Sequence, residues 1–155
     1  SPREMTPEQV GGKTVYLATT NGTPALVAAQ GADAVLVGAA INFSALAERA
    51  RALFVERSDL AIICAGHEKQ FALEDAYVAG RLVKDVKKRL RRVELNDGAG
   101  VALALTQRYK DWQDALKTCE AGRTLQALGL GDDVRFSAQV DQFANVPIYS
   151  ERRIT

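Results

Sequence analysis

The chain has 155 residues, of which 47% are hydrophobic and 25% charged, and its formal net charge is +1. This length and composition predict one globular domain with a substantial core. The near-neutral charge argues against nucleic-acid binding through bulk charge, and no apolar run is long enough for a membrane span. The two cysteines, Cys64 and Cys119, lie far apart and there is a single histidine. We therefore expect reduced thiols, a cytoplasmic protein and no histidine-rich metal site.

The first half of the sequence predicts three units, each made of a strand, a loop and a helix. The expected strands are apolar runs at 13–17, 34–37 and 60–64, and the expected helices are 24–30, 43–57 and 73–92. Continuous apolar runs are typical of parallel strands covered on both faces. We therefore predict an α/β fold, a three-layer α/β/α architecture with a mostly parallel central sheet. Right-handed crossovers would place the three loops at the carboxyl edge of this sheet, where ligands bind in open α/β sheets.

The second half is predicted to be mostly helical. Apolar residues recur at helical spacing at 99–110, and shorter helices are expected at 111–119, 122–128 and 132–138, before a final strand at 146–149. No linker divides the chain, so we predict a single α/β domain over residues 1–155.

The loop after the first expected strand has the chemistry of an anion cradle. It runs directly into a helix and consists of Thr19, Thr20, Asn21, Gly22 and Thr23. Small residues leave backbone N–H groups uncovered, and a helix N-terminus adds the positive end of its dipole. Thr and Asn also cap helices in proteins that bind nothing there, and the loop by itself leaves that alternative open.

The loop after the third expected strand contains Gly66 and leads to Glu74 and Asp75 at the start of a long helix. One carboxylate could bind a divalent cation while the other caps the helix, because adjacent helical residues point too far apart to share one proton. The alternative is that both simply favour the helix dipole. Gly80, within the same helix, costs helix stability unless something packs closely against it.

Further candidates lie outside these loops. Asp97, after Asn96, would be another oxygen ligand for a metal or a phosphate if its helix starts at the ligand edge. Arg3 and Arg123 both sit beside turns, where a guanidinium can hold an anion in bidentate fashion or pair with a neighbouring carboxylate. The basic run at 84–92 is interpreted as a solvated helix face.

In their order and spacing, several short segments resemble the 2-phosphosulfolactate phosphatase family over essentially the whole chain. These segments are 1–5, 19–23, 64–66, 74–75 with 79–80, 96–97, 122–123 and 128–129. The resemblance implies a magnesium-dependent phosphatase that hydrolyses a small phosphorylated sulfonate to sulfolactate and phosphate, a step of coenzyme M biosynthesis in archaeal members.

Phosphate-ester hydrolysis needs a cradle for phosphoryl oxygens, a cation and a positioned water or nucleophile. We expect catalytic roles for Glu74, Asp75 and Asn21, and Mg²⁺ binding by Glu74, Asp75 and Asp97. The residues expected to bind the substrate are Arg3, Thr19, Thr20, Gly22, Thr23, Gly66 and Arg123.

The chain departs from the family in length and in one loop. The segment that resembles Ser1 to Met5 lies well inside family members, so the resemblance implies that an N-terminal portion is absent. Where relatives often carry His or Asn and, two residues earlier, Ser, this chain has Ala121 and Cys119. These departures favour the alternative, a non-catalytic anion-binding or scaffold domain, whereas Glu74 and Asp75 favour an enzyme. We also expect either a homo-oligomer or a complementary N-terminal chain, because an incomplete unit would expose an unpaired edge or an apolar patch.

Overall fold

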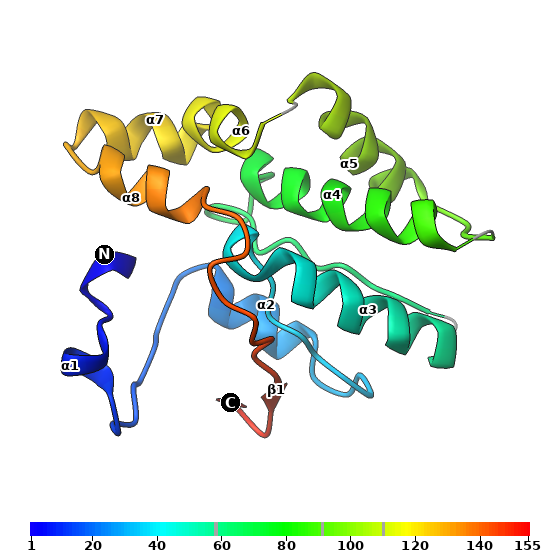
Figure 1. The fold of residues 1–155 in the computed structure, drawn as a ribbon, viewed down its shortest axis with the longest axis horizontal. Coiled ribbons are helices and arrows are strands. Elements are labelled where there is room, and N and C mark those ends of the chain that lie inside the picture. The colour runs from blue at the N-terminus through cyan, green and yellow to red at the C-terminus, as the bar shows by residue number, and fades with distance from the viewer. Residues whose placement is uncertain (58, 91, 110) are drawn as a thin grey trace.

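The structure, a computed structural model, describes residues 1–57, 59–90, 92–109 and 111–155. It consists mainly of helices joined by extended segments (Figure 1). The α-helices are α1 (Pro7–Val10), α2 (Gly22–Ala28), α3 (Phe43–Arg57), α4 (Leu73–Arg89), α5 (Asp97–Arg108), α6 (Trp112–Thr118), α7 (Glu120–Ala127) and α8 (Gly131–Ser137). Two 3₁₀ turns, η1 (Pro2–Glu4) and η2 (Ala40–Asn42), and two short strands, β1 (Tyr149–Ser150) and β2 (Arg153–Ile154), complete the elements.

The predicted helices are confirmed to within a few residues. The helix expected at 43–57 is α3, with the same bounds, and the four expected in the second half are α5 to α8. The helix expected at 73–92 is α4, which ends at Arg89. That prediction included Arg91, and the one at 99–110 included Lys110; both residues lie outside the described ranges.

The predicted three-layer α/β/α fold with a mostly parallel sheet is wrong. Within the described ranges the only sheet is the antiparallel pair of β1 and β2, in which Tyr149 lies opposite Ile154. The run at 34–37 is extended but pairs antiparallel to the C-terminal segment: the Val37 N–H donates to the Pro147 carbonyl oxygen at 2.9 Å.

The apolar runs at 13–17 and 60–64 are not strands of any sheet. Neither exchanges interstrand hydrogen bonds with another described segment, and their large side chains are exposed, Tyr16 to 93%. A parallel sheet exists only where neighbouring backbones exchange hydrogen bonds across its width, and an apolar composition does not supply those neighbours. The carboxyl edge expected to gather the loops is therefore absent from this part of the chain.

The core lies along α4, which is flanked by α3 on one side and α5 on the other (Figure 1). One buried cluster joins α4 to α6 and α8; it contains Ala40, Tyr77, Trp112, Ala115 and Ala138. A second joins α3 to α4 and contains Leu46, Ala47, Ala50, Leu82 and Val86. No helix of the described chain is long and apolar enough to span a membrane.

Close contact between α4 and α5 explains Gly80. A Cβ atom at this position would lie 1.9 Å from the Ala102 carbonyl oxygen. The α4 backbone therefore touches α5 directly at Gly80, as predicted from a glycine inside a long helix. Because Tyr77 stacks edge-on against Tyr109, just after the end of α5, the two helices run antiparallel.

Candidate functional site

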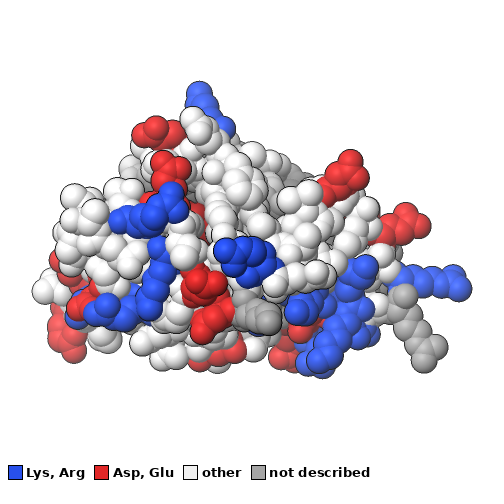
Figure 2. Space-filling view, turned by 90° about the horizontal axis from the view of Figure 1, so that it is seen from above, with Lys and Arg blue, Asp and Glu red and all other residues white. Residues whose placement is uncertain are grey.

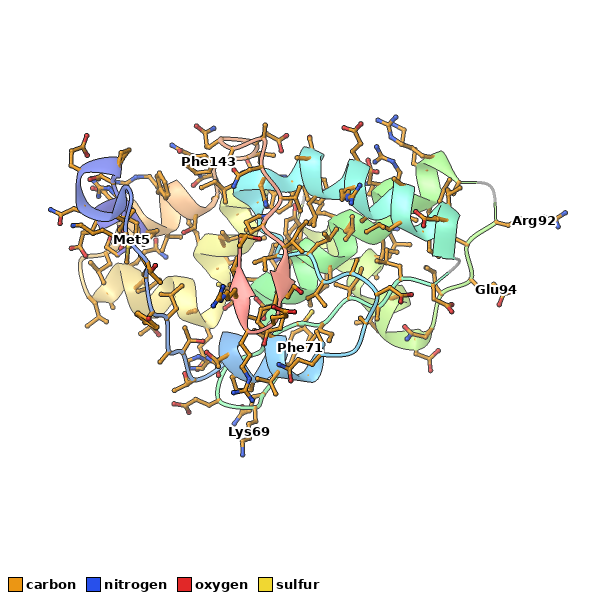
Figure 3. The ribbon with its side chains drawn as sticks, turned by 90° about the horizontal axis from the view of Figure 1, so that it is seen from below. Met5, Lys69, Phe71, Arg92, Glu94 and Phe143 are labelled. Atoms are coloured by element: carbon orange, nitrogen blue, oxygen red, sulfur yellow. The ribbon has the colours of Figure 1, made fainter. Side chains whose placement is uncertain are left out.

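The first turn of α4 is fastened to the turn that precedes it. The Gly66 N–H donates to the Asp75 carboxylate at 2.8 Å. Gly66 has a φ of +73°, and a Cβ there would lie 2.5 Å from the Gln70 carbonyl oxygen, so only glycine fits. The turn closes through mutual backbone hydrogen bonds between His67 and Gln70. Figure 3 shows Lys69 at its tip, pointing away from the body of the molecule.

The Asp75 carboxyl titrates above its ordinary range. Partial burial is the main cause of its raised pKa; the Gly66 N–H opposes this effect, and the negative charge of Glu74 adds to it. A carboxyl group held this way keeps its proton to a higher pH than a free aspartate, whose pKa is about 3.9. Such a group can exchange a proton with a substrate or a bound water more readily than an exposed carboxylate.

The Thr-rich loop is joined to the same turn by Asn21. Its side-chain oxygen accepts a hydrogen bond from the Glu68 N–H at 3.0 Å. Within the loop the Thr19 N–H donates to the Thr23 hydroxyl at 3.2 Å, and the Thr23 N–H donates to the Thr19 hydroxyl at 3.0 Å. The Thr19 hydroxyl thus accepts from an N–H in the first turn of α2, which is the capping alternative that the sequence left open. The backbone N–H groups at 20, 21 and 22 donate to no acceptor among the described residues.

Cys119 lies between α6 and α7 and is buried. Its sulfur accepts a hydrogen bond from the Gly122 N–H at 3.2 Å. Burial is the main cause that raises the pKa of this thiol to about 11; Glu74 raises it further, whereas Arg123 and the Gly122 N–H lower it. Arg123 also donates a hydrogen bond to the Thr118 carbonyl oxygen.

The structure joins two groups of expected site residues through the turn at 66–70. The Thr-rich loop, which contains Thr19, Thr20, Asn21, Gly22 and Thr23, bonds to this turn through Asn21. The start of α4, with Glu74 and Asp75, bonds to it at Gly66. Arg123 lies on α7, and no hydrogen bond among the described residues links it to these groups. Their positions depend on the N-termini of helices and not on the edge of a sheet. An arrangement of backbone N–H groups, a guanidinium and two carboxylates can hold an oxyanion and position a water molecule beside it.

Two predicted site residues lie elsewhere. Arg3 is on η1, where its guanidinium forms an ion pair with Asp132 of α8 at 3.0 Å. Asp97 is the first residue of α5 and, because α5 is antiparallel to α4, lies near the end of α4. Glu74 lies in the first turn of α4. At a rise of 1.5 Å per helical residue, about 20 Å separate it from the end of that helix, near which Asp97 lies. Figure 3 shows Arg92 and Glu94, in the segment between these helices, at that far end.

The metal ligands predicted from the sequence are therefore not assembled as a triad. Among the described residues no three His, Cys, Asp or Glu side chains are grouped to hold a metal ion. Glu74 and Asp75 remain as a pair of carboxylates. Two carboxylates match the usual protein share of a Mg²⁺ site, in which substrate phosphate and water complete the octahedron.

Sequence reasoning missed the local role of Cys119. It placed this residue at the end of the helix expected at 111–119 and expected the next helix only from Gly122. In the structure Cys119 is the N-cap of α7, and its sulfur accepts a hydrogen bond from the Gly122 N–H.

Comparison with known proteins defines the family. A family model described as 2-phosphosulpholactate phosphatase matches residues 1–152. A relative from Thermus thermophilus is 43% identical over 153 residues, covering 98% of this chain and 63% of its own length. Another from Symbiobacterium thermophilum is 37% identical over 155 residues, covering 99% of this chain and 65% of its own length. Both carry the name "Probable 2-phosphosulfolactate phosphatase".

The chain therefore belongs to the 2-phosphosulfolactate phosphatase family, which confirms the resemblance read from its short segments. It spans less than two thirds of the length of these curated relatives.

Proposed function

We propose that this chain forms part of a phosphoric monoester hydrolase acting on a small anionic phosphoester such as 2-phosphosulfolactate, with sulfolactate and phosphate as products. Family membership supports the reaction class, because the relatives are named for this activity. The structural observation that supports the proposal is the joining of the α4 start and of the Thr-rich loop to the turn that contains Gly66.

The phosphate is proposed to bind where uncovered N–H groups and positive charge meet. The loop before α2 supplies the N–H groups at 20–22, and Asn21 ties this loop to the Gly66 turn. Arg123 supplies a guanidinium that can pair with phosphoryl or sulfonate oxygens in bidentate fashion. Together these groups favour a ligand with several negative charges over a neutral one.

The two carboxylates are proposed to act on the attacking water and on a bound metal ion. Asp75, whose pKa is raised mainly by burial, would accept a proton from an attacking water. Glu74 and Asp75 would be the protein ligands of a Mg²⁺ ion. When bound, such an ion neutralises charge that develops on the phosphoryl oxygens.

Association with a second polypeptide, either another copy or a complementary N-terminal chain, is part of this proposal. It is supported by the exposed apolar side chains of the runs at 13–17 and 60–64. A cytoplasmic location is also proposed, supported by two cysteines that form no disulfide with each other.

The test is phosphate release from 2-phosphosulfolactate in the presence of Mg²⁺. We expect Glu74→Gln and Asp75→Asn each to lower kcat/KM by about 100-fold or more, since each removes a group placed at the reacting phosphate. The matched control is Glu94→Gln, an exposed carboxylate at the far end of the molecule, which should retain wild-type turnover.

Calorimetric titration with 2-phosphosulfolactate separates the two candidate functions. Binding with turnover supports the hydrolase. Binding without turnover supports the non-catalytic anion-binding domain, which the loss of polarity at Ala121 favours. Absence of both, or full turnover in the Glu74 and Asp75 variants, contradicts the proposed site.

A further inference from the structure

Asn21 stands at the N-cap of α2, but its side chain does not cap that helix. An asparagine at this position usually accepts a hydrogen bond from a backbone N–H in the first turn of its own helix. In this chain the Thr19 hydroxyl accepts such a bond, from the Thr23 N–H at 3.0 Å. The Asn21 side-chain oxygen instead accepts from the Glu68 N–H at 3.0 Å, 47 residues further along the chain. The side chain therefore joins two segments that are distant in sequence.

The turn at 66–70 has a backbone conformation that its own side chains do not favour. His67 and Gln70 exchange backbone hydrogen bonds of 3.1 and 2.8 Å. The two residues between them, Glu68 and Lys69, have φ values of +49° and +65°. Positive φ at both central positions is typical of a type I′ turn, where Asn and Gly are preferred. In this left-handed region the Cβ of a larger residue crowds the following carbonyl oxygen, so contacts from outside the turn have a conformational cost to offset.

Two hydrogen bonds join this turn to other parts of the described chain. The Glu68 N–H donates to Asn21, and the Gly66 N–H donates to the Asp75 carboxylate at 2.8 Å. The tip of the turn, Lys69, points away from the body of the molecule (Figure 3). Because Gly66 lies two residues before Glu68, the direction of its N–H depends on the conformation of the same short turn. Asn21 and Asp75 are thus connected through one exposed turn.

We propose that Asn21 is a positioning residue of the site: its side-chain oxygen holds the turn at 66–70 in its left-handed conformation. In this conformation the Gly66 N–H donates to the Asp75 carboxylate and fixes its position. The inference rests on the proposed function, in which Asp75 accepts a proton from an attacking water. Asn21 then acts on the reaction through the turn, without touching the reacting atoms. Without its oxygen, the turn would adopt other backbone conformations and the carboxylate would lose the N–H that orients it.

The first test compares Asn21→Ala with Gln30→Ala in phosphate release from 2-phosphosulfolactate. Each variant removes one of the two side-chain hydrogen bonds that join residues 19–30 to distant parts of the described chain; Gln30 donates to the Tyr149 hydroxyl at 3.1 Å. We expect Asn21→Ala to lower kcat by about tenfold and to change KM by less than about twofold, as for residues that orient a reacting group. Gln30→Ala, the matched control, should keep the wild-type kcat. A raised KM with unchanged kcat in Asn21→Ala, or wild-type values of both, overturns the inference.

A second pair of substitutions tests whether Asn21 acts through the turn. Glu68→Asn with Lys69→Gly supplies the residue types that favour positive φ at these two positions, so the turn no longer needs an outside contact. Added to Asn21→Ala, this pair should restore most of the lost kcat. A folded combined variant without that restoration contradicts the positioning role. If Asn21→Ala alone does not fold, the combined variant carries the test, and its own failure to fold would contradict the inference as well.

Amide hydrogen exchange at Gly66 tests the same contact without any substrate. We expect Asn21→Ala to raise the exchange rate of this N–H by about three- to tenfold, because its bond to Asp75 then opens more often, and Gln30→Ala to leave the rate unchanged. An unchanged rate in Asn21→Ala overturns the inference and leaves the hydrolase intact. If the wild type neither binds nor hydrolyses the ester, the proposed function falls and the positioning role falls with it. The two failures are distinguished because one is seen in exchange and the other in turnover.

Discussion

At the scale of single residues, the two cysteines show how the surroundings of a thiol change its pKa and its reactivity. Cys64 is exposed, and its pKa is raised by partial burial and by the negative charge of Asp75. Cys119 is buried, and its pKa is raised to about 11. Because a thiolate and not a thiol is the nucleophile, neither residue is activated at neutral pH.

The first prediction concerns the reaction of these thiols with iodoacetamide at pH 8. At this pH only about one Cys119 side chain in a thousand is ionised, and it is also covered, so Cys64 should be modified first. Raising the pH should accelerate modification of Cys64. Peptide mass spectrometry over time distinguishes the sites, and the protein in denaturant, where both should react alike, is the control. Equal labelling in the folded protein would contradict the burial of Cys119.

A raised thiol pKa also sets the direction of a pH effect on stability. The folded chain holds the Cys119 proton more tightly than the unfolded chain, whose cysteine pKa is about 8.5. The contribution of this thiol to the free energy of unfolding is therefore complete below a pH of about 8.5 and is lost as the pH rises toward 11. Alkaline solution should destabilise the fold through this residue.

At the scale of elements, contact between helix backbones organises the core. Gly80 of α4 lies against the Ala102 carbonyl oxygen of α5, and Gly122 of α7 lies against the Leu116 carbonyl oxygen of α6. In both places the missing side chain allows one element to touch another. The conformational cost of glycine in a helix is thus offset by close packing.

The second prediction compares two glycines within helices. Gly80→Ala forces a methyl group into the α4–α5 contact and should lower the free energy of unfolding by about 1–3 kcal/mol. For a chain of this size the melting temperature should fall by about 3–10 °C. The control is Gly100→Ala in α5, where a Cβ meets nothing within 4 Å. It should stabilise the protein by up to about 1 kcal/mol. Circular dichroism during heating measures both, and equal shifts would contradict the close approach.

At the scale of the whole molecule, charge and apolar surface are unevenly distributed. Figure 2 shows several Lys and Arg side chains at the end of the molecule where α4 ends and α5 begins. Exposed apolar side chains of the two unpaired runs include Val15, Tyr16 and Leu17 in the first and Leu60, Ile62 and Ile63 in the second. Extended apolar segments with unpaired backbone groups favour association with another polypeptide.

The third prediction tests that association. The isolated chain should self-associate at micromolar concentrations, seen as a mass above 16.7 kDa that rises with concentration in sedimentation equilibrium. Tyr16→Lys combined with Ile63→Lys should shift the chain toward the monomer. Val101→Lys, at an exposed apolar position on α5, is the matched control and should leave association unchanged. A monomer at all concentrations, for wild type and variants alike, would argue against a partner at these runs.

The helices, and the candidate residues at their starts, could be predicted from the sequence. Helical hydrogen bonds join residues four apart, so the apolar spacing and polar first turns of α3, α5 and α7 were visible locally. Family membership was also visible, because it depends on the order of short segments along the chain.

Which segments meet depended on the folded arrangement. Strand pairing joins residues that are distant in sequence, so the apolar runs at 13–17 and 60–64 looked like strands although no segment that the structure describes pairs with them. The same reason separates Asp97 from Asp75: both begin helices after polar turns, but antiparallel packing of α4 and α5 puts them at opposite ends. Tyr77 of α4 stacks on Trp112 of α6, a contact that no local pattern records.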